Sequence, residues 1–145
     1  MIQKHALTFC LVVLAFLAGL AVNHHAVIAA QGMNKVYELR TYTTNDGKLP
    51  NLLTRFGGGE TDLFHKHGMT SVGYWVPDDP ELSKNTMVYM LAHDSRDAAA
   101  ASWEAFGNDP EWREMSASSQ VDGRILARGG VVNLFLNPTD FSPAK

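Results

Sequence analysis

The sequence is short of cysteine. Its single cysteine, Cys10, lies in an apolar run near the N-terminus, and residues 31–145 contain none. That larger part of the chain therefore has no disulfides, no thiolate nucleophile and no cysteine-ligated metal. The small residues typical of a lipoprotein cleavage site do not precede Cys10, so a lipid anchor is not expected.

An excess of basic charge is also missing. The chain has 12 Lys and Arg against 15 Asp and Glu, and residues 1–30 contribute only Lys4 to these totals. Residues 31–145 thus have a net charge of −4 with histidine neutral. A phosphate backbone needs a basic surface to bind, so nucleic acid is not an expected partner.

Catalytic and phosphate-binding motifs are missing as well. No serine lies in a nucleophile elbow, and Gly57-Gly58-Gly59 lacks the Lys-Ser/Thr of a P-loop. His65 and His67 diverge on a helix, because a pair two residues apart lies about 200° around the axis, and so they do not form a metal site. We predict no metal and no cofactor, and the sequence leaves open whether the protein is an enzyme.

The first thirty residues have the pattern of an export signal. The apolar run 6–22 follows Lys4 and precedes the small residues 26–30, which is typical of a secretory signal peptide cleaved after Ala30 or, alternatively, after Ala29. The run has 17 residues, close to the span of about 20 that crosses a bilayer, so an uncleaved membrane anchor is the alternative. We therefore expect residues 1–30 to direct export to the periplasm or exterior and residues 31–145 to form one domain.

The rest of the chain alternates strand and helix patterns. Strands are predicted at 36–42, 69–76, 86–93 and within 123–136, from β-branched and aromatic runs bounded by turn residues. Apolar residues at helical spacing predict a helix over 49–67, interrupted at its three glycines, and a second helical region from Ser95 to Ser119 that restarts at Asp109-Pro110. The order β-α-β-β-α-β predicts an α+β, ferredoxin-like sandwich with a four-stranded antiparallel sheet and two helices on one face.

The first strand has two different faces, because side chains alternate along a strand. Leu39 lies on one face and the charged Glu38 and Arg40 on the other, next to Tyr42. If the helices cover the Leu39 side, then Glu38, Arg40 and Tyr42 face a second copy of the chain and are candidates for a dimer face. The Glu38–Arg40 pair is then a cross-strand or cross-dimer ion pair.

Four short motifs resemble the NIPSNAP domain over roughly residues 34–143. They are the Tyr37–Tyr42 stretch with Gly47, then His67-Gly68, then Gly73-Tyr74-Trp75, and finally Asp109-Pro110-Glu111-Trp112. The resemblance implies a dimeric α/β barrel, in which two ferredoxin-like units pack their sheets together. The organelle roles of mitochondrial relatives are not transferred to this chain, because its N-terminus indicates export.

Five residues are candidates for a pocket between helices and sheet, where related dimeric barrels hold small ligands: Tyr37, His67, Trp75, Tyr89 and His93. For His67 the alternative is a buried histidine that ends its helix. The leading hypothesis is an exported homodimeric binding or interaction module that takes a small apolar ligand. The alternative is a cofactor-independent enzyme of the monooxygenase or isomerase kind, which requires at least two of His67, Tyr89 and His93 to converge in a closed pocket.

Overall fold

A computed structural model describes residues 35–144 of the chain. The predicted export signal and its cleavage site lie outside the described residues. The described part contains four strands and their helices in the order β1 (Val36–Thr44), α2 (Leu49–Arg55), α3 (Thr61–Lys66), β2 (Thr70–Trp75), β3 (Thr86–His93), α4 (Arg96–Asn108), α5 (Pro110–Ser118) and β4 (Leu126–Leu136). This is the predicted β-α-β-β-α-β order.

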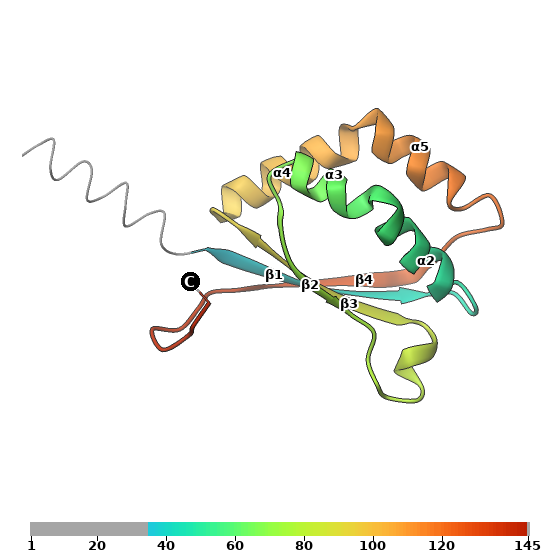
Figure 1. The fold of residues 1–145 in the computed structure, drawn as a ribbon, viewed down its shortest axis with the longest axis horizontal. Coiled ribbons are helices and arrows are strands. Elements are labelled where there is room, and N and C mark those ends of the chain that lie inside the picture. Colours follow the sequence, from blue (N-terminus) through green and yellow to red (C-terminus); the bar gives the residue numbers. More distant parts are fainter. Residues whose placement is uncertain (1–34, 145) are drawn as a thin grey trace, which may run out of the picture. The chain divides into compact units, whose positions relative to one another are not determined.

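The strands form one antiparallel sheet in the order β2-β3-β1-β4. In the centre, Arg40 of β1 lies opposite Tyr89 of β3 and Asn133 of β4. The α-helices cover one face of the sheet, and the C-terminal segment and the β2–β3 connection lie on the other side (Figure 1). The predicted four-stranded ferredoxin-like fold is confirmed.

The glycine triplet forms a kink between α2 and α3. It forms a π-helical turn, η1 (Phe56–Glu60), in which Gly59 has a φ of 127° that favours glycine. A π-helical turn changes the direction in which side chains leave the helix. As a result Phe56 and Glu60 both point into the protein and are buried.

The two later helices begin at the residues that the sequence indicates. Ser95 accepts a hydrogen bond from the backbone amide of Ala98 at the start of α4, and Asp109 accepts one from the amide of Glu111 at the start of α5. Such caps satisfy amide groups that a helix leaves unpaired at its N-terminus. Because α4 ends only at Asn108, the two helices follow each other directly over the sheet.

The core between helices and sheet is rich in aromatic rings. Tyr89 at the centre of the sheet is fully buried. Its ring stacks with Phe64 of α3 at a centroid distance of 5.9 Å and with Tyr74 of β2 at 5.8 Å. Phe56 packs edge-on against Tyr42 and Tyr89. These contacts place the Tyr42–Tyr89 face of the sheet under the helices.

Candidate functional site

A fully buried carboxylate, Glu38, forms the centre of the candidate site. Its Oε1 accepts hydrogen bonds from Arg40 Nη1 at 2.6 Å and Asn133 Nδ2 at 3.2 Å. Its Oε2 accepts from Trp103 Nε1 at 2.7 Å and lies 3.1 Å from His93 Nε2. The carboxylate thus joins β1, β3, β4 and α4 into one polar lattice, which we call the Glu38 lattice (Glu38, Arg40, His93, Trp103 and Asn133).

These contacts keep Glu38 ionised. Burial alone would raise the pKa of Glu38, but hydrogen bonds from His93 and Trp103, together with the charge of Arg40, outweigh burial and lower the pKa to about 2. The pKa of the Arg40 guanidinium is raised in spite of its own burial. A carboxylate with a pKa that low is a poor proton acceptor near neutral pH, because its conjugate acid is too strong.

An open hollow of about 530 Å³ lies above the Glu38 lattice, between α4 and β4. We call it the α4–β4 hollow; it is lined by Glu38, Arg40, Arg96, Ala100, Trp103, Asn133 and Phe135. Two guanidinium groups lie over aromatic rings at its wall. The Cζ atom of Arg40 is 4.1 Å from the Trp103 ring centroid, and that of Arg96 is 4.1 Å from the Phe135 centroid.

The three residues of the enzyme hypothesis do not share a pocket. His93 belongs to the Glu38 lattice, Tyr89 donates a hydrogen bond to the Tyr42 hydroxyl at 2.8 Å, and His67 Nε2 lies 2.6 Å from Asp109 Oδ2. None of the three lines the α4–β4 hollow. This dispersal argues against a catalytic centre built on those residues. His67 instead follows the last residue of α3 and ties that helix to the start of α5.

The remaining two pocket candidates, Tyr37 and Trp75, lie on the opposite face of the sheet from the helices. Tyr37 neighbours Ala92 and Leu136 in register, and Trp75 neighbours Val88. Trp75 is 51% exposed. Tyr37 and Trp75 therefore do not line a pocket beneath the helices.

The predicted dimer face was wrong, because the helices cover the other side of β1. Glu38 is bonded to Trp103 of α4, Arg40 lies on the same ring, and Tyr42 packs against Phe56 of η1. The expected Glu38–Arg40 ion pair is present, but inside one copy of the chain. Alternation along the strand correctly groups these residues; it does not tell which group faces the helices.

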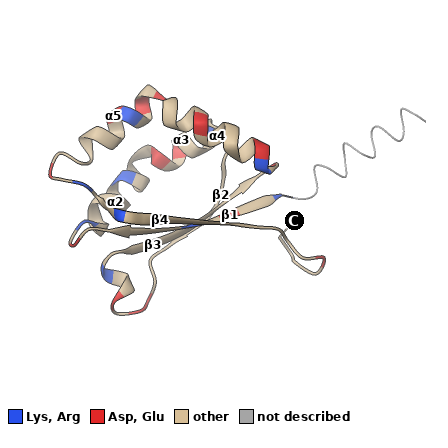
Figure 2. Ribbon diagram, turned by 180° about the vertical axis from the view of Figure 1, so that it is seen from behind, with Lys and Arg blue, Asp and Glu red and all other residues tan. Residues whose placement is uncertain are grey.

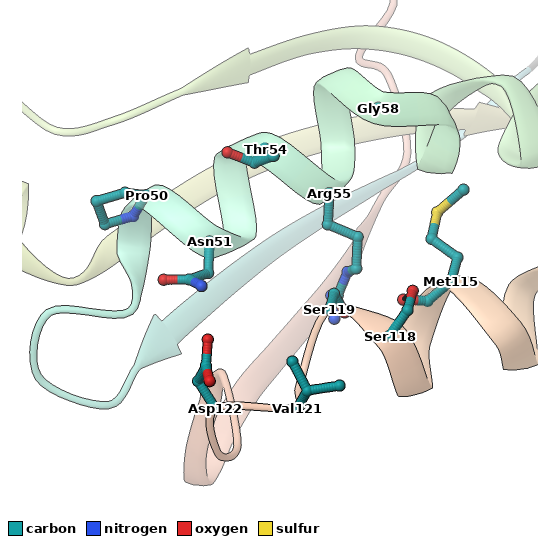
Figure 3. A pocket seen from close by; sticks show the side chains of 10 residues that line it. All are labelled: Pro50, Asn51, Thr54, Arg55, Gly58, Met115, Ser118, Ser119, Val121 and Asp122. Carbon is teal, nitrogen blue, oxygen red and sulfur yellow. Dashed lines mark hydrogen bonds between the residues drawn. The ribbon is translucent and has the colours of Figure 1, made fainter.

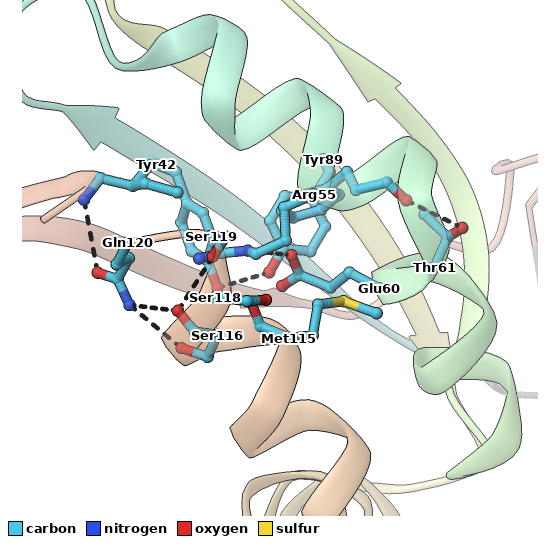
Figure 4. Close-up of polar contacts among 12 residues, drawn as sticks. Tyr42, Arg55, Glu60, Thr61, Tyr89, Met115, Ser116, Ser118, Ser119 and Gln120 are labelled. Atoms are coloured by element: carbon cyan, nitrogen blue, oxygen red, sulfur yellow. Dashed lines mark hydrogen bonds and ion pairs between the residues drawn. The ribbon is translucent and has the colours of Figure 1, made fainter. Parts of the chain in front are cut away.

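A second buried ion pair lies under the other end of the helical layer. Arg55 Nε, at the end of α2, is 2.7 Å from Glu60 Oε2 in η1, and both side chains are almost fully buried. Figure 4 shows this pair beside the hydroxyl groups of Tyr42 and Tyr89. Burial raises the pKa of Glu60, and the charge and hydrogen bond of Arg55 oppose that rise.

Arg55 also lines a second hollow, of about 500 Å³, between α2 and α5. Its side chain reaches from α2 toward the end of α5 and Ser119 (Figure 3), and its Cζ lies 5.1 Å from the Trp112 centroid. The guanidinium is already neutralised by Glu60. We therefore assign the Arg55–Glu60 pair to the packing of α5 on the first helical segment.

Trp103, Asn133 and Arg96 were not predicted from the sequence as members of a site. A signal for two of them existed: Arg96, Ala100 and Trp103 recur at helical spacing on α4 and so share one side of it. Asn133 is a polar residue in an otherwise apolar strand. Only the register, which sets Asn133 opposite Arg40, brings these residues to Glu38.

The contacts of two carboxyl groups predict that the folded protein becomes less stable at acidic pH. The pKa of Glu38 is lowered to about 2, and hydrogen bonds from Lys66 and His67 hold the pKa of Asp109 below its usual range. A carboxyl group whose pKa is lower in the folded than in the unfolded state stabilises the fold at pH values above its unfolded-state pKa. This stabilisation is lost as the pH falls through the folded-state pKa. We expect the unfolding free energy to decrease between pH 4.5, the usual value for Glu, and about 2. Urea titrations at several pH values check this, and an unchanged unfolding midpoint across that interval would contradict it.

Two other searches of the described residues are negative. Between residues 35 and 144, no three His, Cys, Asp or Glu side chains are grouped as a metal site requires. None of the helices in the same range is long and apolar enough to cross a membrane.

Comparison with known proteins identifies the relatives of this chain. The NIPSNAP family profile matches residues 37–143, and no curated protein matches. A NIPSNAP family protein of unknown function from Agrobacterium tumefaciens is 24% identical, with a TM-score of 0.65 over 78% of this chain and 96% of the other. A NIPSNAP domain protein from Burkholderia xenovorans is 26% identical, with a TM-score of 0.62 over 74% of this chain and 98% of its own.

A more distant likeness extends to a monooxygenase from Streptomyces coelicolor, solved in complex with nanaomycin D. It is 16% identical, with a TM-score of 0.53 over 74% of this chain and 89% of that one. At this identity the likeness shows the fold alone. The family match, in contrast, spans most of the chain, and this protein therefore belongs to the NIPSNAP family.

Proposed function

We propose that this protein is a homodimeric binding module, in which each copy holds a small ligand in the α4–β4 hollow. The observation that carries the proposal is the Glu38 lattice, which lies at the base of an open hollow and links residues from four elements. A rigid charged base with aromatic walls is typical of a small-molecule site. The low pKa of Glu38 favours binding over acid–base chemistry.

Filling the hollow tests this function. Ala100 lines the hollow from α4 and is exposed, so A100F places a ring in the ligand space without replacing any residue of the Glu38 lattice. We expect native mass spectrometry of the protein recovered from the cell envelope to show a bound small molecule, and A100F to lose it. The matched control is A101F, an exposed position on the same helix that does not line the hollow. An equal bound mass on both variants, or no bound mass on the unmodified protein, would contradict the proposal.

The uncovered face of the sheet supports the homodimer. Its paired positions include no Lys, Arg, Asp or Glu, and charged residues lie mainly on the helices and loops (Figure 2). Trp75, Val132 and Leu134 of this face are 51%, 61% and 57% exposed. An apolar sheet face of this kind is typical of a protein–protein contact, and a second copy with the same face is the simplest partner.

A charge on the uncovered face is expected to separate the copies. In a symmetric dimer, L134E places two carboxylates in one apolar contact, and we expect the mass to change from two copies of residues 31–145 to one. The control is L53E, which adds the same charge at a 41% exposed leucine of α2, on the helical side. Native mass spectrometry measures whether each variant has the mass of one copy or of two. A dimeric L134E or a monomeric parent protein would overturn the assignment of this face.

A further inference from the structure

We propose that the ligand of the α4–β4 hollow is a flat organic anion: an aromatic carboxylate that also carries a hydroxyl or amino donor. This inference rests on the proposed binding function and specifies the class of ligand. Its first basis is charge. Within the hollow, Arg40 neutralises Glu38 across 2.6 Å, whereas Arg96 has no acidic partner within ion-pair distance in residues 35–144.

Arg96 is placed to receive a carboxylate. It is exposed at the first residue of α4, and its guanidinium lies over the Phe135 ring with Cζ 4.1 Å from the centroid. Stacking on a ring orients the guanidinium and leaves its edge available for a two-point contact with a carboxylate. The N-terminal end of a 13-residue helix adds positive potential at the same place.

The walls of the hollow favour a flat apolar body. Trp103 and Phe135 contribute aromatic surface, and the Arg40 guanidinium lies over the Trp103 ring with its Cζ 4.1 Å from the ring centroid. Ala100 leaves the space between them open. Since binding sites of roughly 300–1,000 Å³ hold drug-sized ligands, a hollow of about 530 Å³ accommodates a molecule of one or two rings.

Asn133 supplies the third element of recognition. Its amide nitrogen donates to Glu38 Oε1, because an amide oxygen would be repelled by the carboxylate. The amide oxygen is thereby directed away from Glu38, and within residues 35–144 it accepts no hydrogen bond. An acceptor in this position selects a ligand with an O–H or N–H group.

Isothermal titration calorimetry with three probes tests this class of ligand. The probes are a hydroxynaphthoate, its neutral methyl ester and the naphthoate that lacks the hydroxyl group. We expect the hydroxynaphthoate to bind most tightly and R96Q to weaken it by about 10-fold or more, as loss of a charge-assisted contact does. The ester should bind the unmodified protein more weakly than the acid does, and R96Q should not change the affinity for the ester.

The matched control is R128Q. Arg128 is likewise exposed and has no ion pair in the described part of the chain, so R128Q removes the same charge elsewhere and should leave the affinity within about 2-fold. Equal affinities for acid and ester, equal effects of R96Q and R128Q, or no binding of any probe would overturn the inference.

The A100F variant separates this inference from the proposed function. If A100F abolishes binding of acid and ester alike while R96Q has no effect, the hollow binds ligands and only the anionic class is wrong. If the probes bind A100F as they bind the unmodified protein, the assignment of the hollow itself is wrong.

Discussion

E38Q is expected to lower the free energy of unfolding by about 3 to 5 kcal/mol, the usual cost of breaking a buried ion pair. Glutamine keeps the shape of the side chain but removes the charge that Arg40 faces at 2.6 Å. It also turns one of two acceptor oxygens into a donor, which then opposes either Asn133 and Arg40 at Oε1 or Trp103 at Oε2. Equilibrium unfolding in urea, followed by circular dichroism, measures the change.

The control for E38Q is E104Q, which makes the same replacement at an exposed position of α4. We expect E104Q to change the unfolding free energy by less than about 0.5 kcal/mol, as surface substitutions generally do. E38Q should also remove the part of the loss of stability between pH 4.5 and about 2 that comes from Glu38, because glutamine does not titrate; the part from Asp109 should remain. An E38Q protein as stable as the E104Q protein would show that the Glu38 lattice does not hold the fold together.

R55M is expected to destabilise the protein by about 3 kcal/mol near neutral pH, because it leaves a buried carboxylate without its cation. Arg55 and Glu60 are 4% and 2% exposed, so water cannot replace the lost contact. The effect should be smaller at pH 5. Without Arg55, the pKa of Glu60, which burial already raises, rises further. A carboxyl group whose pKa is higher in the folded than in the unfolded state stabilises the fold at pH values below its unfolded-state pKa. That stabilisation is lost as the pH rises through the folded-state pKa.

A double variant and a surface control complete that experiment. R55M/E60L replaces the whole pair by apolar side chains and should recover most of the stability lost in R55M, since an apolar pair of similar volume often matches a buried ion pair. R124M replaces an exposed arginine and should leave the free energy of unfolding almost unchanged. If R55M and R55M/E60L are equally unstable at every pH, unpaired charge is not the cause.

Local sequence signals predicted the order and type of the elements. Alternating β-branched and aromatic residues mark β1 and β3, and Ser95 and Asp109 mark the starts of α4 and α5. These signals act within a few residues, because capping and alternation depend on neighbouring backbone groups. The helical phase on both sides of the glycine triplet likewise predicted a helix interrupted at its glycines, and the structure has a kink at Gly59 in η1, between α2 and α3.

The candidate site was much less predictable. Its central residues, Glu38 and Arg40, were assigned to the wrong face because strand alternation has no absolute direction. The helices cover the charged side since Trp103 and Asn133 can satisfy Glu38 there, and a buried carboxylate needs such donors. Local patterns placed His67 at the end of a helix and His93 at the end of a strand, but their partners, Asp109 and Glu38, are 42 and 55 residues away in the chain.

The sequence by itself determined the element order, the family and the apolar alternation of the strands, since these depend on short-range backbone preferences and on motifs that can be read in order. Only the tertiary structure decided which face the helices cover and which residues meet at Glu38. Those outcomes depend on strand register and on the position of α4, which bring together residues up to 95 positions apart. The physical reason is that a buried carboxylate is stable only where enough hydrogen-bond donors from distant elements surround it. A local sequence pattern does not predict which distant residues these are.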